Sequence, residues 1–279
     1  MSDGPLWRRI PEGLGASVRS LGQTLRAAVS YIGGVSSLAG SAAERFGRSV
    51  LRTGPRVRLS VVAAQCFRFG VRSIPIIAIV QVFIGIILAL NIAPTLASYG
   101  QVENVAVIIA IGVFRELGPL ITAILLSGYA GASIAAELGA MVEGEEIKAM
   151  RAHALDPIRF LVAPRVVATA VMMVGLTVIA DAVGVAGGLV TGVFVLDISP
   201  QIYMDLTQQS VTHRDYLTGL FKGGVFGAVI ASLACYEGLS VEGGAEGVGR
   251  ATTTTVVKSI VALIGADMVF TSVFYVLGW

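Results

Sequence analysis

The stretch Phe114-Arg115-Glu116-Leu117-Gly118-Pro119 places an arginine and a glutamate between two uncharged runs, 104–113 and 120–136. Both runs have the composition of lipid-embedded helix. Charged side chains at membrane depth are costly and usually face a bundle interior or a water-filled cavity. Pro119 removes a backbone donor and favours a kink at this point. The stretch therefore predicts a bent membrane-spanning helix that carries an internal charged site.

Composition agrees with a protein that crosses a membrane several times. The chain has 279 residues, of which 55% are hydrophobic and 14% charged, whereas a soluble domain is about 25% charged. Glycine is abundant, with 34 residues, which suits close approach of helices in lipid. Cys66 and Cys235 have no paired spacing, so we expect neither a disulfide framework nor a metal site. No apolar run follows Arg8 and Arg9, and no cleaved signal peptide is predicted.

Hydropathy predicts an all-α integral membrane protein with five spans, since about 20 apolar residues cross the hydrocarbon. The predicted spans are 74–93, 104–126, 166–190, 216–235 and 256–277, within a transmembrane domain 74–279. Asp181 interrupts the third span and Asp267 the fifth. Gly219, Gly223 and Gly227 predict a close-packing seam on the fourth. A short surface helix is expected at 200–209, and Pro94 is expected to begin the outer turn after the first span.

Residues 1–73 form a basic, partly amphipathic arm. Apolar residues recur at helical spacing in the first part of the arm, at Leu14, Val18, Leu21, Leu25 and Val29. A second stretch, 56–72, alternates apolar and basic residues. We expect one or two helices lying in the cytoplasmic headgroup layer. The alternatives are a soluble arm or a nucleic-acid-binding tail, which fit less well because apolar residues alternate with the arginines throughout.

The basic residues also predict the orientation. Eleven of the 20 lysines and arginines precede Ser73, while four lie in the loop 142–165 and two in the loop 236–258. The positive-inside rule then places the N-terminus in the cytoplasm and the C-terminus outside. An odd number of spans makes an inverted repeat within one chain awkward. A symmetric dimer that builds a shared cavity is more natural.

The two polar loops between spans differ in the structure that they predict. Residues 145–153 contain neither glycine nor proline and favour a helix, which Asp156-Pro157 should end. The glycine-rich stretch 243–249 lacks a strand–turn–helix context, so we expect a flexible loop rather than a nucleotide cradle. The chain contains no G-x-x-x-x-G-K-[ST], H-E-x-x-H or G-x-S-x-G motif. We therefore predict a protein that is not an enzyme and has no ATP site of its own.

Several motifs in fixed order resemble the MlaE family, the permease subunits of bacterial ABC transporters that move phospholipid with MCE proteins. They are F-R-E-L-G-P-L-I-T-A at 114–123, G-Y-A-G-A-S-I-A-A-E-L-G-A-M at 128–141, E-E-I-K-A-M at 145–150, L-D-P at 155–157, A-P-R at 163–165 and G-V-G-R-A-T-T at 247–253. The resemblance covers residues 73–279, and the arm matches only in character. Asn91 stands where the family often has glutamine, and Val142-Glu143-Gly144 is an unusual lead-in to the following helix.

The resemblance implies roles for particular residues. A cytoplasmic coupling helix at 145–152 would dock on an ATPase through Glu143, Glu145, Glu146, Lys148 and Arg151; the alternative is a plain solvated loop. A lipid pocket at the dimer centre would include Arg115, Glu116 and Leu117, with Leu88, Leu96 and Tyr99 from the outer end of the first span. The alternatives are lipid-facing or packing side chains for the last three, and a mutual ion pair for Arg115 and Glu116. Asp181 and Asp267 are expected to hydrogen-bond neighbouring helices.

The resemblance also implies the assembly. We expect a homodimer in the bacterial inner membrane, with a cytoplasmic ABC ATPase, a periplasmic MCE protein and a small STAS-type cytoplasmic protein as partners, and phospholipid as substrate. No cofactor, metal or nucleic acid is expected. Two alternatives remain open: a stand-alone ion-coupled carrier or channel that uses Asp181, Asp267 and Glu116, and a structural membrane anchor without a transport path.

Overall fold

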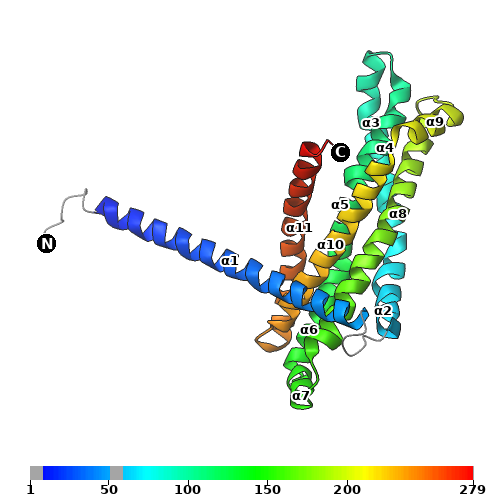
Figure 1. Ribbon diagram of the computed structural model, residues 1–279. Coiled ribbons are helices and arrows are strands. Elements are labelled where there is room, and N and C mark those ends of the chain that lie inside the picture. The colour runs from blue at the N-terminus through cyan, green and yellow to red at the C-terminus, as the bar shows by residue number, and fades with distance from the viewer. Residues whose placement is uncertain (1–8, 51–58, 279) are drawn as a thin grey trace.

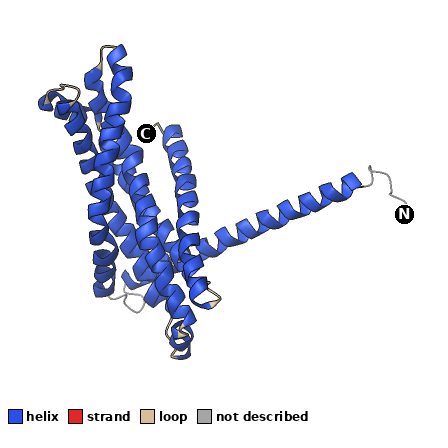
Figure 2. Cartoon of the chain, turned by 180° about the vertical axis from the view of Figure 1, so that it is seen from behind, coloured by secondary structure: helices blue, strands red, loops and turns tan. Residues whose placement is uncertain are grey.

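The computed structural model describes residues 9–50 and 59–278, and these residues are almost entirely helical (Figures 1 and 2). No strand occurs within the described ranges. The α-helices are α1 (Arg9–Val50), α2 (Leu59–Gln65), α3 (Ile74–Ser98), α4 (Val105–Gly112), α5 (Gly118–Leu126), α6 (Ala132–Glu143), α7 (Glu146–Ala152), α8 (Ala163–Phe194), α9 (Pro200–Ser210), α10 (His213–Leu239) and α11 (Gly244–Val276). The predicted all-α membrane fold is confirmed.

Five helical segments in the described part of the chain are long and apolar enough to cross a membrane: Ser60–Ser98, Val102–Glu143, Ile158–Phe194, His213–Leu239 and Gly244–Val276. Each is longer than its predicted span because the helices continue past the apolar core. Pro94 lies inside α3 rather than in the turn. The glycine-rich stretch 243–249 is not a loop, because Gly243, with φ 96°, is the N-cap of α11 and the helix begins at Gly244. That expectation was wrong.

The N-terminal arm divides into two parts. Helix α1 crosses the bundle near the end that carries α7 and extends well beyond it (Figure 1). Ala42 of α1 is buried against the bundle, whereas Val29 is 68% exposed. The second predicted interfacial stretch instead runs through α2, a π turn (Cys66–Gly70) and a 3-10 turn (Val71–Ser73) directly into α3. The parts of the arm at 1–8 and 51–58 lie outside the described residues.

Helix α8 is the centre of the bundle and packs against α3, α5 and α10. Glycines allow this contact: a Cβ on Gly187 would lie 2.4 Å from the Val82 carbonyl oxygen of α3. The predicted seam on α10 is also confirmed. A Cβ on Gly227 would lie 2.6 Å from the Thr169 carbonyl oxygen of α8, and one on Gly219 would lie 2.1 Å from the Phe114 carbonyl oxygen. Side chains larger than hydrogen would separate these helices.

The second span is bent by two π-helical turns, Val113–Leu117 and Ser127–Gly131. The first ends two residues before Pro119 of the opening motif, and the N–H of Gly118 donates to the carbonyl oxygen of Val113 across it. Pro119 has no N–H to continue a regular ladder, so a wider turn at this point satisfies the backbone. We call residues 113–117 the π turn; they include Arg115 and Glu116.

Candidate binding cavity

A cavity of about 270 Å³ opens between the second span, α10 and α11. It is lined by Ile111, Gly112, Arg115, Glu116, Thr218, Lys222, Thr271, Phe274 and Tyr275. The π turn supplies the charged pair, α10 supplies Lys222, and the last turns of α11 supply the aromatic side chains. The cavity thus has a charged wall and an apolar wall, which is the arrangement an amphiphile requires.

Lys222 is the centre of the charged wall. Its side chain is only 1% exposed, and its ammonium lies 2.8 Å from Glu116 Oε2 and 2.9 Å from Asp267 Oδ1. It also donates to the Thr271 hydroxyl at 3.0 Å, and that hydroxyl donates to Glu116 Oε1 at 2.8 Å. One cation therefore joins three spans through two carboxylate partners.

Arg115 has a different partner. Its Nε lies 3.1 Å from Asp215 Oδ1. Asp215 is fixed in turn because its other oxygen accepts the Thr212 backbone N–H at 2.9 Å, in the capping box that begins α10. The alternative that Arg115 and Glu116 form a mutual ion pair is therefore wrong. Consecutive residues on a helical turn point in different directions, so each reaches a separate element.

The other predicted pocket residues lie elsewhere in the chain. Leu88 and Leu96 are partly buried against a second hydrophobic cluster that includes Val105, Ile109 and Tyr203. Tyr99 is 75% exposed in the turn after α3. Neither these residues nor Leu117 are among the lining residues of the cavity.

Sequence reasoning missed Lys222, Thr271 and Phe274. A usable signal existed for Lys222, because a lone lysine in a span marks a functional position by default. Asp267 hydrogen-bonds a neighbouring helix, as expected. Asp181 does not: neither of its carboxylate oxygens has a hydrogen-bond partner among the described residues.

At the opposite end of the bundle, α7 projects away from the membrane-spanning helices (Figure 1). Its N-cap Glu145 has a left-handed backbone (φ 58°) and pairs with Lys148 at 2.8 Å. The hydrogen bond from Lys148 lowers the pKa of the fully exposed Glu145 carboxyl. Ile147 is 6% exposed and anchors the helix. The remaining charged residues face outward, so α7 presents a charged surface on a fixed base.

A partly buried ionic group lies on the segments around α6, which leads into α7. Glu137 on α6 pairs with Arg165 at 3.1 Å and also with Arg68 of the turn after α2. Arg165 further donates to the Leu161 carbonyl oxygen. The group therefore joins the ends of the first three spans that lie nearest α7, so that displacement of α6 moves its neighbours as well.

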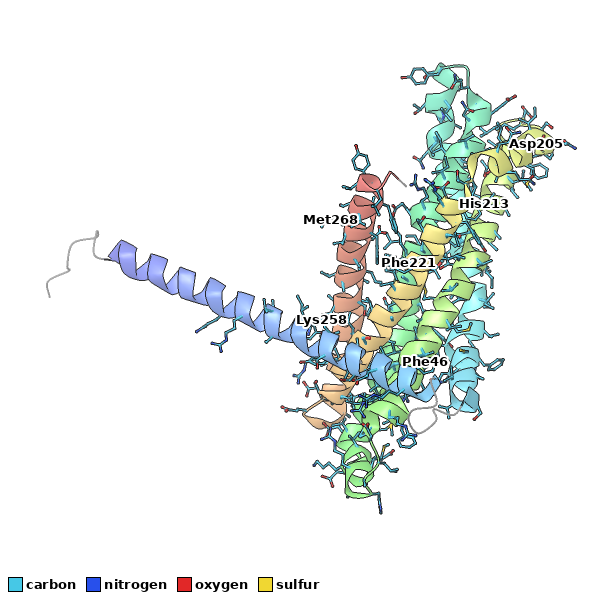
Figure 3. The ribbon with its side chains drawn as sticks, viewed as in Figure 1. Phe46, Asp205, His213, Phe221, Lys258 and Met268 are labelled. Carbon is cyan, nitrogen blue, oxygen red and sulfur yellow. The ribbon has the colours of Figure 1, made fainter. Side chains whose placement is uncertain are left out.

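Helix α1 is attached at two places at the same end. Tyr31 donates to the Glu237 carboxylate, which also accepts from Lys258 at 2.7 Å, and the Lys258 ammonium lies 3.9 Å from the Tyr31 ring centroid. Figure 3 labels Lys258 at this crossing. Nearer its C-terminal end, α1 is attached by an Arg45–Asp156 ion pair. These contacts hold the C-terminal half of α1, from Tyr31 to Arg45, against the bundle.

The five spans and the internal charged cavity define a polytopic helical membrane protein with a polar site inside its bundle. Residues 62–273 match the family model described as Permease MlaE, and the chain belongs to this family. It is a transport subunit rather than an enzyme.

Named relatives agree with this assignment. The chain is 36% identical over 227 residues to a probable ABC transporter permease protein of Rickettsia felis, covering 81% of this chain and 87% of the relative. It is 30% identical over 231 residues to the intermembrane phospholipid transport system permease protein MlaE of Haemophilus influenzae, covering 82% and 88%. It is 33% identical over 211 residues to the chloroplastic protein TRIGALACTOSYLDIACYLGLYCEROL 1 of Arabidopsis thaliana, covering 76% and 60%.

Proposed function

We propose that this chain is the permease subunit of an ABC-type transporter that moves phospholipid between the inner membrane and the periplasm or outer membrane. A separate cytoplasmic ATPase would drive it, a periplasmic MCE protein would exchange lipid with it, and a small STAS-type protein would bind on the cytoplasmic side. The observation that carries the proposal is the cavity, with Arg115 and Lys222 on one wall and Phe274 on another. The Haemophilus relative named for phospholipid transport supports the same substrate class.

The cavity suits a phospholipid headgroup. A guanidinium and an ammonium are the side-chain groups that best bind a phosphate diester. Both cations are held by carboxylates, so a phosphate would exchange partners with Glu116 or Asp215 rather than meet an unpaired charge. Acyl chains would lie against the apolar wall and the lipid-exposed surface beyond it.

A homodimer would enlarge this site. One face of α11 is exposed along its length, at Val257, Val261, Ile264, Met268 and Tyr275. Small residues near this face, such as Gly265, meet no atom within 4 Å, which permits close approach of another helix. A second copy covering this face would place two cavities near one twofold axis.

The proposed coupling runs from α7 to the π turn. Helices α6, α5 and α4 are one bent segment, Val102–Glu143, so a push on α7 travels along the second span to Glu116. The proposed contacts with the ATPase are Glu143, Glu145, Glu146, Lys148 and Arg151. With α7 on the cytoplasmic side, the N-terminus would lie in the cytoplasm and the C-terminus in the periplasm, as the positive-inside rule also predicts.

The test is ATP-driven lipid transfer by the reconstituted complex. Arg115→Met should lose most transfer while the purified dimer keeps its size and thermal stability, because Asp215 retains its capping bond to Thr212. Arg214→Met is the matched control, since it removes an exposed arginine from the same end of α10 that does not line the cavity. Equal transfer by both variants would contradict the proposal. Transfer driven by an ion gradient without the ATPase would favour the carrier alternative.

A further inference from the structure

Asp181 of α8 and Gln81 of α3 are buried polar residues outside the cavity. Asp181 is 1% exposed and Gln81 is 0% exposed. Both carboxylate oxygens of Asp181 and the Oε1 of Gln81 have no hydrogen-bond partner among the described residues. Buried polar groups nearly always have a partner. Two neighbouring exceptions in one bundle therefore require an explanation.

The two side chains meet the same short piece of backbone. The Gln81 amide donates to the carbonyl oxygens of Leu117 and Gly118, at 3.4 and 3.3 Å. A Cβ on Gly118 would lie 1.8 Å from Asp181 Oδ1. A Cβ on Gly184, one turn along α8 from Asp181, would lie 3.5 Å from Gln81 Oε1. The carboxyl and the amide thus belong to one interior site between α3, α5 and α8.

No charged side chain in the described part of the chain is paired with Asp181. Helices α3, α4 and α5 contain no Asp, Glu, Lys, Arg or His residue. Around the cavity, Arg115 binds Asp215, and Lys222 binds Glu116 and Asp267. These charged groups of the π turn, α10 and α11 are therefore paired with one another.

The other charged groups on elements packed against α8 lie toward the ends of the bundle. His213 and Arg214 begin α10, Glu237 is in its last turn and Asp205 is on α9. At the end of the bundle near α7, Arg68 and Arg165 bind Glu137, and Arg45 binds Asp156. Glu44 and Arg48 pair with each other on α1. Arg72 lies in the turn before α3, and Arg159 lies in the turn before α8. An ionised Asp181 would therefore be a buried charge without a partner, which is strongly unfavourable.

We propose that Asp181 and the Gln81 amide form a proton-binding site inside the transmembrane bundle, with Asp181 held as the neutral carboxylic acid. Gln81 Oε1 is the acceptor available for the acid proton. A metal cation fits this site poorly, because hard cations take six or more oxygen ligands and the site offers one carboxyl and one amide oxygen.

The site is joined to the π turn, so its protonation reaches the cavity. Gln81 holds the carbonyl groups of Leu117 and Gly118, and the Gly118 N–H closes the turn onto Val113. Loss of the proton would draw the Gln81 amide N–H groups to the carboxylate and release those carbonyl groups. The turn that carries Arg115 and Glu116 would then change shape. This consequence for transport rests on the proposed function, but the proton site itself does not.

Infrared spectroscopy of the full-length protein in lipid nanodiscs tests the site directly. At neutral pH the wild type should show the C=O stretching band of a protonated, water-excluded carboxylic acid. Asp181→Asn should remove this band, and Asp205→Asn, which changes the exposed aspartate labelled on α9 in Figure 3, should retain it. Absence of the band in the wild type, or its persistence in Asp181→Asn, would overturn the proposal.

A second variant keeps the test decisive if Asp181→Asn fails to fold. Gln81→Leu should retain the band and move it to higher frequency, because the acid proton loses its acceptor; an unchanged frequency would reject the pairing with Gln81.

Replacing Na⁺ by choline at constant pH should leave the band unaltered, and a band that grows when Na⁺ is removed would identify a cation site instead. In lipid transfer, the wild type should decline at alkaline pH and Asp181→Asn should not. A normal band with no transfer at any pH would reject the proposed function and leave the proton site intact.

Discussion

The ammonium of Lys222 lies 2.8 Å from Glu116 Oε2, which joins the fourth span to the π turn of the second inside the bundle. Asp267 of the fifth span completes the group at 2.9 Å. Three membrane-spanning segments thus meet at one buried cation. A charge network of this kind resists sliding of the helices but can exchange partners, which is what a cavity that binds and releases a charged headgroup needs.

Replacement of this cation should destabilise the protein. Lys222→Met leaves Glu116 and Asp267 without their shared partner, and removal of one member of a buried ion pair costs about 3–5 kcal/mol. Thermal unfolding in nanodiscs measures the loss. The double variant Lys222→Met, Asp267→Asn should recover part of it, because Glu116 keeps its bond from Thr271. A single variant as stable as the wild type would show that the network contributes little.

A side chain on Gly118 should also destabilise the fold. In Gly118→Ala the new Cβ would lie 1.8 Å from Asp181 Oδ1 and 2.9 Å from the Val113 carbonyl oxygen, and overpacking of this kind costs about 1–3 kcal/mol. Gly112→Ala is the control, since its Cβ would meet no atom within 4 Å. It should be neutral or stabilising by up to about 1 kcal/mol in an unfolding assay. The reverse order of stability would contradict the packing described for α5 against α8.

Charge reversal on α7 should uncouple ATP hydrolysis from lipid movement. The variant Glu145→Lys, Glu146→Lys changes exposed residues of the proposed coupling helix α7, so the protein should remain folded while ATP-driven transfer is abolished. Glu103→Lys, an exposed change at the other end of the bundle, should transfer lipid normally. Unaltered transfer in the double variant would defeat the coupling role of α7.

The attachment of α1 should weaken at alkaline pH. Burial, and then the hydrogen bond to Glu237, raise the pKa of the Tyr31 phenol far above its ordinary value of about 10. A phenol whose folded-state pKa is raised stabilises the fold below its unfolded-state pKa, and this contribution is lost progressively as pH rises above that value. The protection of the α1 backbone amides, measured relative to their base-catalysed intrinsic exchange, should therefore fall above about pH 10.

Tyr31→Phe is the matched variant for that measurement. It keeps the ring beside Lys258 and removes the hydrogen bond to Glu237, which should cost about 1.5–3 kcal/mol of local stability because the acceptor is charged. Its α1 exchange should be faster than that of the wild type at neutral pH and should lack the alkaline step. Identical exchange in both proteins would show that Tyr31 does not hold α1.

A charge on the exposed face of α11 should prevent formation of the proposed homodimer. Ile264→Arg places a cation in an apolar face, where burial by a second copy would leave the cation unpaired and strongly disfavoured. Mass measurement in mild detergent should report a monomer. Val171→Arg, a 58%-exposed position on α8, should remain dimeric. A dimeric Ile264→Arg protein would place the interface elsewhere.

Much of the architecture followed from local patterning. Hydropathy predicted the number of spans, and glycine spacing predicted the seam at Gly219, Gly223 and Gly227; a short helix at 200–209 was also expected and corresponds to α9. The errors came where a local rule met a tertiary constraint. Pro94 stays helical within a long α3, and the glycine-rich stretch 243–249 folds as the start of α11 because Gly243 caps it.

The sequence by itself determined that this chain is a five-span helical protein with charges inside its bundle. The length of each apolar run and the position of each charge within it are local properties of the sequence, and a charge in lipid is unfavourable wherever it occurs. Only the tertiary structure decided which charges meet. Arg115 and Glu116 are adjacent in the chain yet bind Asp215 and Lys222, and Asp181 has no ionic partner among the described residues. Partner choice depends on the rotation and depth of packed helices, which the glycine contacts of α8 and α10 set and which no local pattern encodes.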